Sequence, residues 1–152
     1  MVMNEQRRAL LKYSAVFGLM SSAGLISTAQ AEEWNKAAFE GKSLDEVFKA
    51  LGASSPDKSS TVVLNAPDIA ENGAVVPVSI TSSLKADQIA ILVEKNPAVL
   101  AAQFFIPNGT EAFVTTRIKM GQSSNVYALV KTDGKWVMAV KEIKVTLGGC
   151  GG

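Results

Sequence analysis

The chain has 152 residues, of which 47% are hydrophobic and 19% charged, with a formal net charge of +1. This composition is typical of one globular domain and excludes a disordered polypeptide or a membrane-spanning bundle. There is no histidine and a single cysteine, Cys150. A Ser/His/Asp triad, an internal disulfide and a metal site of histidines or clustered cysteines are therefore excluded, and no metal or cofactor is expected.

Residues 1–31 have the order of an export signal. Arg7 and Arg8 precede an apolar run that ends in small residues, with Ala29 and Ala31 in an A-x-A cleavage pattern. The run is shorter than the roughly 20 residues of a membrane-spanning helix, so no stable membrane insertion is expected after cleavage at Ala31. The twin arginine resembles the Tat signal pattern, which predicts export by the Tat machinery to the periplasm. A Sec signal and an uncleaved anchor are the alternatives.

The charges of the remaining chain are sparse and mixed. Arg117 is the only arginine beyond residue 31 and the lysines are scattered, so no nucleic acid partner is expected. Arg117 and Lys119 are two positions apart, which places them on one face of a strand. They could meet an anionic substrate or an acidic partner, but a solvated strand face is the simpler interpretation.

The first part of the mature chain is predicted to be helical. Ser43 and Glu46 form a capping box, apolar residues then recur at helical spacing, and Gly52 ends the pattern. A helix is therefore expected over residues 44–51. A weaker helical pattern covers residues 32–39, and the Ser-rich segment 53–60 is interpreted as a linker.

From residue 61 the apolar period changes from helical to two. Seven β-rich runs are separated by turn residues: 61–64, 75–81, 89–94, 101–106, 112–120, 126–132 and 136–147. Asp133 and Gly134 between the last two predict a hairpin. Pro77 has no backbone N–H to donate to a neighbouring strand, so its run should be an edge strand or contain a bulge. The pattern favours an all-β, immunoglobulin-like antiparallel sandwich, with a small barrel as the alternative.

Two local features of these runs leave alternatives open. Lys141 interrupts an alternating apolar series, which suggests a bulge nearby. The run Phe104, Phe105, Ile106 offers apolar side chains to both faces of a sheet. Either a partner protein or the N-terminal helices would cover the second face.

The last five residues hold the single thiol. In this segment two glycines flank the cysteine on each side: Gly148, Gly149, Cys150, Gly151 and Gly152. Glycine has the widest backbone freedom, so a mobile C-terminal arm (residues 148–152) is expected, on which three residues reach about 10 Å beyond Leu147. Without a histidine to activate it, the thiol suits a covalent carrier whose partners supply the catalytic groups. An intermolecular disulfide, a metal-scavenging tail and an artificial scar are equally compatible with the composition.

These residues resemble a known family. The arm, preceded by Lys144, Val145 and Thr146, resembles the C-terminus of SoxY, the sulfur-carrier subunit of the bacterial thiosulfate-oxidising Sox system. Similar segments recur upstream from about residue 74: Asn96 with Pro97, residues 104–107, residues 116–120 and residues 133–135. Val99 departs from the pattern, which has a second proline there.

The resemblance implies a mechanism. SoxY pairs with SoxZ, the SoxAX cytochrome joins thiosulfate oxidatively to the cysteine, and SoxB releases sulfate to leave a persulfide, on which SoxCD acts where it is present. Cys150 would be the covalent attachment point, and the protein would be a carrier without catalysis of its own. The competing hypothesis is a secreted binding or structural sandwich whose terminal cysteine forms an intermolecular disulfide. A thiol peroxidase is a weaker third hypothesis.

The expected organisation has four parts. They are a Tat-type signal peptide (1–31), a helical lead with its linker (32–60), a β-sandwich domain (61–147) and the carrier arm (148–152).

Overall fold

The computed structural model describes residues 35–146, which form two short helices and nine strands. Helix α2 spans Lys36–Glu40 and helix α3 spans Leu44–Leu51. The strands are β1 (Asp57–Lys58), β2 (Val62–Asn65), β3 (Ile69–Ala70), β4 (Val76–Ser82), β5 (Gln88–Val93), β6 (Leu100–Phe105), β7 (Phe113–Ile118), β8 (Ser124–Thr132) and β9 (Lys135–Val145). In this part of the chain no helix is long and apolar enough to cross a membrane.

Helix α3 confirms the predicted capping and termination signals. Ser43 Oγ accepts the Glu46 amide at 3.3 Å, and the Glu46 carboxylate reaches back to the amide of Lys42 at 2.7 Å. Gly52 ends the helix in the left-handed conformation, with φ 69°, which a residue without a Cβ adopts at little cost. Helix α2 lies at the end of the weaker predicted segment; residues 32–34 of that segment lie outside the described part.

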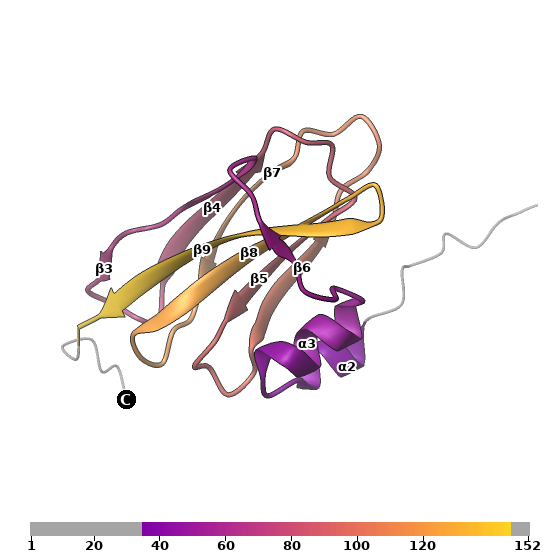
Figure 1. Cartoon of the computed structure of the whole chain (residues 1–152). Coiled ribbons are helices and arrows are strands. Elements are labelled where there is room, and N and C mark those ends of the chain that lie inside the picture. Colours follow the sequence, from indigo (N-terminus) through magenta and orange to yellow (C-terminus); the bar gives the residue numbers. More distant parts are fainter. Residues whose placement is uncertain (1–34, 147–152) are drawn as a thin grey trace, which may run out of the picture. The chain divides into compact units, whose positions relative to one another are not determined.

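The strands form two sheets, which confirms a sandwich and not a barrel. The larger sheet has the order β1-β9-β8-β5-β6, with β3 also paired to β9; the smaller has the order β2-β4-β7. The pairs among β5, β6, β8 and β9 and those of the smaller sheet are antiparallel, whereas β1 and β3 run parallel to β9. Figure 1 shows helices α2 and α3 together on one side of the larger sheet.

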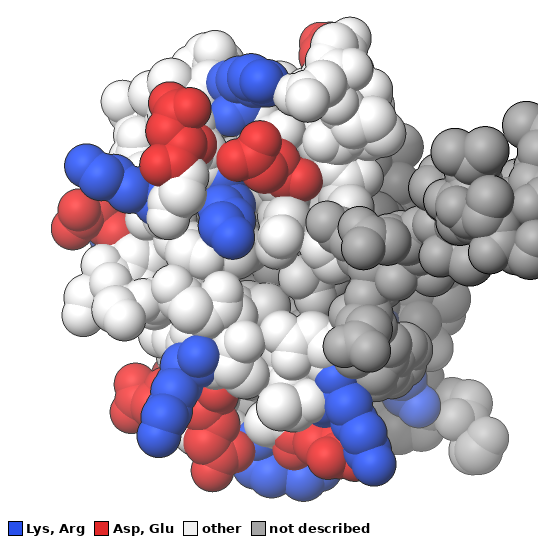
Figure 2. All heavy atoms as spheres, turned by 90° about the vertical axis from the view of Figure 1, so that its right-hand side faces the viewer, with Lys and Arg blue, Asp and Glu red and all other residues white. Residues whose placement is uncertain are grey.

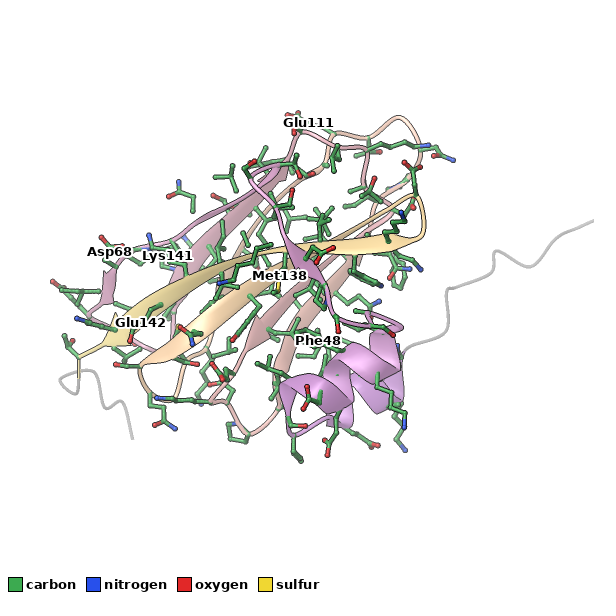
Figure 3. The ribbon with its side chains drawn as sticks, in the orientation of Figure 1. Phe48, Asp68, Glu111, Met138, Lys141 and Glu142 are labelled. Atoms are coloured by element: carbon green, nitrogen blue, oxygen red, sulfur yellow. The ribbon has the colours of Figure 1, made fainter. Side chains whose placement is uncertain are left out.

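Strand β5 packs against both neighbouring layers, the smaller sheet on one side and the helices on the other. All its residues except Gln88 are buried. Ile89 and Ile91 join the core between the two sheets, whereas Ala90 and Leu92 join a second core beneath the helices. Alternate side chains of a strand point to opposite faces, so β5 faces apolar layers on both sides. In this second core Phe48 of α3 and Met138 of β9 pack at the margin (Figure 3).

The run from Phe104 to Ile106 follows the same rule. Phe104 and Ile106 pack against the core between the sheets, while Phe105 remains 43% exposed. Helix α2 packs against β6. Within the described residues the helices thus account for part of the second face of β6.

Each of the seven predicted runs coincides with a strand within a few residues, and the turn at Asp133 and Gly134 has positive φ at both positions, 47° and 75°. Two strands of two residues each were not predicted. β1 lies inside the segment 53–60, interpreted as a linker, and β3 lies in the connection between β2 and β4.

The prediction for Pro77 was wrong. β4 is the central strand of the smaller sheet, and its register with β7 continues through Pro77 without a shift. The proline is tolerated because pairing with β2 stops at Asn65↔Ser79. At Pro77 no strand therefore lies on the β2 side, which is the side to which the missing amide would point.

The bulge expected near Lys141 is also absent, because Lys141 pairs with Val126 in an unbroken register between β8 and β9. Its ammonium donates to Ala66 O and pairs with Asp68, so the charge at the end of the long side chain has polar partners. A lysine can therefore occupy an inward position without displacing the strand.

Candidate functional site

The thiol and its glycines lie outside the described residues: Gly148, Gly149, Cys150, Gly151 and Gly152. So do the leader residues Arg7, Arg8 and Ala31. The structure describes the strand and loops that precede the arm, up to Thr146. Extended chain spans at most about 3.5 Å per residue, so the Cα of Cys150 lies within about 14 Å of the Cα of Thr146. The candidate site is accordingly the end of β9 and the loops around it, here called the arm base (residues 66–73, 94–96, 119–124 and 141–146).

The end of β9 is held from one side by β3. Ile69 pairs with Lys144, and Ala70 pairs with Val145, in parallel register. The amide of Lys144 donates to Asp68 O at 2.9 Å, and the amide of Thr146 donates to Ala70 O at 3.1 Å. Figure 1 shows β3 beside the C-terminal end of β9.

Ser123 holds the same strand end from the opposite side. Its hydroxyl accepts the amide of Val145 at 2.8 Å and lies 3.5 Å from Val145 O. The Thr146 hydroxyl reaches Glu71 O at 3.4 Å. Since each bond restricts the backbone, the chain is fixed through Thr146 before the arm begins.

Gly73 brings three segments into contact at the arm base. Its carbonyl accepts the amide of Met120 at 2.6 Å. A Cβ at this position would lie 2.8 Å from Val145 Cγ1 and closer still to Met120 O. Only glycine allows this approach of the β3–β4 loop to the end of β7 and to β9.

Lys141 ties the segment before β3 to β9. Its Nζ donates to Ala66 O and lies 3.0 Å from Asp68 Oδ1. Figure 3 shows Lys141 and Asp68 side by side, with Glu142 next along β9. Because Asp68 also accepts the amide of Lys144 through its carbonyl, the lysine fixes the strand that borders the arm.

Asn96 joins the remaining loops of the arm base. Its side chain donates to Lys119 O at 2.7 Å and accepts the amide of Gly121 at 3.1 Å. Next to it, the buried Ser124 hydroxyl accepts the amide of Lys95 at 3.0 Å. The β5–β6 and β7–β8 loops therefore form one connected unit.

A polar group on β8 lies near this unit. Glu94 accepts Asn125 Nδ2 at 2.9 Å and Tyr127 Oη at 3.4 Å. Burial, and then the negative charge of Glu94, raise the pKa of Tyr127 above its ordinary value. Tyr127 is therefore a neutral hydrogen-bond donor at physiological pH and no base for a thiol.

Arg117 and Lys119 are both exposed and follow one face of β7, as the sequence predicts. The ion pairs found among residues 35–146 are Lys36 with Glu40 and Lys141 with Asp68. A hollow of about 210 Å³ lies beside this face and is lined by uncharged residues: Asn65, Ala66, Pro67, Pro77, Val78, Ser79 and Thr115. It offers an anion no cationic side chain.

Charges on the end of the molecule remote from the C-terminal end of β9 are of both signs. Figure 2 shows that the lysines and the acidic residues of this face gather in two zones, with an uncharged band between them. Blue and red groups are interspersed in each zone. This face therefore lacks the single-sign field that steers nucleic acid binding.

Sequence reasoning located the thiol but missed the residues that fix the strand before it. Gly73, Ser123 and β3 belong to loops that were interpreted only as turns. Asn96 was noted as a family landmark, and the structure gives it a bridging role. The small and polar composition of these loops is the only signal that could have pointed to them.

Comparisons with known proteins show which proteins the chain resembles. The profile of a family described as Sulfur oxidation protein SoxY matches residues 48–150, so the match extends to the cysteine. The structure of the sulfur carrier protein SoxY from Chlorobium limicola f thiosulfatophilum is 33% identical, with a TM-score of 0.61, over 68% of this chain and 94% of that one. Among curated proteins, none matches.

Proposed function

The chain belongs to the SoxY family of sulfur oxidation proteins, and from this membership we propose that Cys150 is the residue on which it carries sulfur. The protein is a sulfur carrier in sulfur oxidation and not an enzyme by itself. The observation that supports the role of Cys150 most strongly is that the family match reaches residue 150, where the chain has its only cysteine.

The structure supports separate roles for the folded domain, which fixes the chain through Thr146, and for the arm, which carries the thiol. Bonds from Ala70, Glu71 and Ser123 fix the chain through Thr146. The four residues to Cys150 then set a reach of about 14 Å. A thiol on such a short, side-chain-poor segment can enter a narrow pocket of another protein, where the partner supplies the activating groups.

The proposed chemistry has two balanced steps on Cys150. In the first, the thiol and thiosulfate form a sulfur–sulfur bond, which releases one proton and two electrons to the SoxAX cytochrome and leaves the S-thiosulfonate. In the second, water attacks the terminal sulfur under catalysis by SoxB, which releases sulfate and a proton and leaves a persulfide. SoxCD, where present, oxidises the remaining sulfane sulfur.

The proposed setting is the periplasm, with SoxZ as the partner subunit. The twin arginine and the A-x-A pattern of residues 1–31 support export by the Tat machinery. Family membership supports partners from the Sox system. The carrier has no cofactor in this proposal, since the sulfur intermediates on Cys150 are its cargo.

Intact-mass analysis tests the attachment residue. Protein from the periplasm of cells grown on thiosulfate is measured without reductant, after reduction, and as Cys150→Ser. We expect reductant-labile additions of about 32, 80 or 112 Da, corresponding to S, SO3 and S2O3, on the wild-type chain and none on the variant.

The competing hypothesis gives a different result. A thiol that is free or only joined in a disulfide dimer, together with thiosulfate oxidation that survives Cys150→Ser, would contradict the carrier role of Cys150. A structural sandwich linked through its terminal cysteine would then be the better explanation.

A further inference from the structure

The chain contains two Asn-Gly pairs, Asn72 with Gly73 and Asn108 with Gly109. In such a pair the backbone nitrogen of the glycine can attack the side-chain amide carbon of the asparagine, because glycine has no side chain to obstruct the approach. A five-membered ring forms and then opens to a carboxylate. The fold gives the two pairs opposite surroundings, so the two asparagines should differ in this reaction.

The first pair is held on both sides of its peptide bond. Asn72 Oδ1 accepts the amide of Ala74 at 2.9 Å, and Asn72 O accepts the amide of Val75 at 3.2 Å. Gly73 is buried, its carbonyl accepts the amide of Met120, and its surroundings leave no room for a Cβ. Ring closure needs an eclipsed asparagine side chain and a rotated peptide. The bonds and the packing oppose both movements, and burial limits the access of water to the Gly73 amide.

The second pair lies in an open turn between β6 and β7, where residues 107–110 are all exposed. The amide of Thr110 donates to Pro107 O at 3.1 Å and Gly109 has a φ of 82°, which is typical of a type II turn with glycine at its third position. Within residues 35–146 the Asn108 side chain has no hydrogen-bond partner, and a Cβ added at Gly109 would meet nothing within 4 Å. Both reacting groups are therefore accessible and free to rotate.

We propose that Asn108 is a site of spontaneous deamidation in the folded protein and that the fold protects Asn72. In the first step the Gly109 nitrogen bonds to Cγ of Asn108 and the bond from Cγ to Nδ2 breaks. The Gly109 amide proton leaves with Nδ2 as ammonia. In the second step water opens the ring, at the Cγ carbonyl to give aspartate or at the backbone carbonyl to give isoaspartate. Water is the only co-reactant, and nothing is oxidised or reduced.

The reaction changes the turn and leaves the arm base intact. Either product replaces a neutral amide by a carboxylate and so adds a negative charge. Isoaspartate also leads the main chain through Cβ, which adds one atom inside the turn that Thr110 and Pro107 close. Phe105, just before the turn, pairs with Gln88 at the start of β5, whereas the arm base lies at the other end of β5. The bonds that fix Thr146 should therefore be unaffected.

Peptide mapping tests both parts of the proposal. The mature chain is incubated at mildly alkaline pH, folded or in guanidinium chloride, and trypsin then places the two pairs in separate peptides, 59–85 and 96–117. Deamidation adds about 1 Da to a peptide. In the folded chain we expect peptide 96–117 to gain this mass within about twofold of its unfolded rate. Peptide 59–85 should gain it at least about tenfold more slowly than when unfolded, because its hydrogen bonds and packing must open first.

Asn108→Gln is the matched variant. A glutamine would have to form a larger ring, so peptide 96–117 of the variant should gain no mass over the same period, and substitution at an exposed turn should not disturb the fold. Asn96 shares this peptide but precedes Pro97, which has no amide proton to lose. A methyltransferase specific for isoaspartate should label peptide 96–117 of the folded wild type and leave peptide 59–85 unlabelled.

Three results would overturn the proposal: equal rates at the two sites of the folded chain, protection of Asn108 as strong as that of Asn72, or a mass gain that survives Asn108→Gln. The reaction uses no thiol, so Cys150→Ser should leave its rate unchanged. The masses of wild-type Cys150 adducts report separately on the carrier function.

Discussion

Gly73 is the residue on which the packing of the arm base depends most directly. Gly73→Ala would press its methyl group against Met120 O and Val145 Cγ1. We expect a loss of unfolding free energy of about 1–3 kcal/mol, because an overpacked contact must move backbone apart. Urea denaturation measures the loss, and hydrogen exchange at Val145 and Thr146 locates it.

Gly121→Ala is the control for that substitution. It lies in the neighbouring loop, where an added Cβ would meet only Asn96 Oδ1 at 4.0 Å. Its stability should stay within about 0.5 kcal/mol of the wild type. Equal losses from both substitutions would mean that the close approach at Gly73 is not the cause.

Tyr127 gives the protein a stability change at high pH. Burial and the charge of Glu94 raise its pKa in the folded state above the ordinary value of 10.0. The unfolded chain therefore loses this proton first. The stability contributed by neutral Tyr127 is fully present below pH 10 and is lost as the pH rises through the folded pKa.

Absorbance of tyrosinate measures this shift directly. Tyr127 is the only tyrosine beyond residue 31, so the mature chain gives a single titration. We expect its midpoint above 10, and a lower midpoint in Glu94→Gln. Urea midpoints should fall less between pH 9 and 11 in Tyr127→Phe than in the wild type. A wild-type midpoint at or below 10 would contradict the raised pKa, and an unchanged midpoint in Glu94→Gln would contradict the role assigned to Glu94.

At the scale of elements, Lys141 decides how firmly the segment before β3 is attached to β9. Lys141→Met removes the donor to Ala66 O, and Ala66 is buried. An unpaired buried carbonyl costs about 1–3 kcal/mol, and that loss is expected in urea denaturation. Asp68→Asn tests the ion pair alone; since the Asp68 side chain is 89% exposed, its effect should stay below about 1 kcal/mol. The reverse order would show that the ion pair, and not the carbonyl, attaches the segment.

The long elements could be predicted from sequence because each has a period or a capping signal. Helix α3 follows from Ser43, Glu46 and Gly52, and the β8–β9 hairpin follows from Asp133 and Gly134. These signals act within a few residues of the chain. Contacts that form only in the folded state do not influence them.

The short and non-local elements could not be predicted for the same physical reason. β1 and β3 have two residues each, too few to show alternation, and both depend on β9 far along the chain. Pro77 looked like an edge marker, but the early end of β2 makes its position tolerable. At the arm base, the chain shows Cys150 and its glycines plainly, whereas the contact of Gly73 with Val145 exists only after folding.

At the scale of the whole molecule, the sandwich fixes the chain up to Thr146, and only four residues lead from there to the thiol of Cys150. The two cores hold the larger sheet between the smaller sheet and the helices. β9 contributes to both and ends at the arm base, where β3 and Ser123 fix it. The position of Thr146 is thus set by the entire sandwich. The maximum distance of the Cys150 thiol from Thr146 is set by the number of residues between them.

Arm length should therefore control the carrier function independently of the fold. Deleting Gly148 and Gly149 leaves only Leu147 between Thr146 and Cys150, and the maximum Cα–Cα distance from Thr146 to Cys150 falls from about 14 Å to about 7 Å. We expect thiosulfate-dependent oxygen uptake, reconstituted with the partner enzymes, to fall at least tenfold, while the melting temperature is unchanged because Thr146 and its bonds remain. Replacing the same glycines by two alanines keeps the length and restricts the backbone. Full activity in the shortened chain would show that reach does not limit delivery, and equal losses in both variants would assign the requirement to glycine itself.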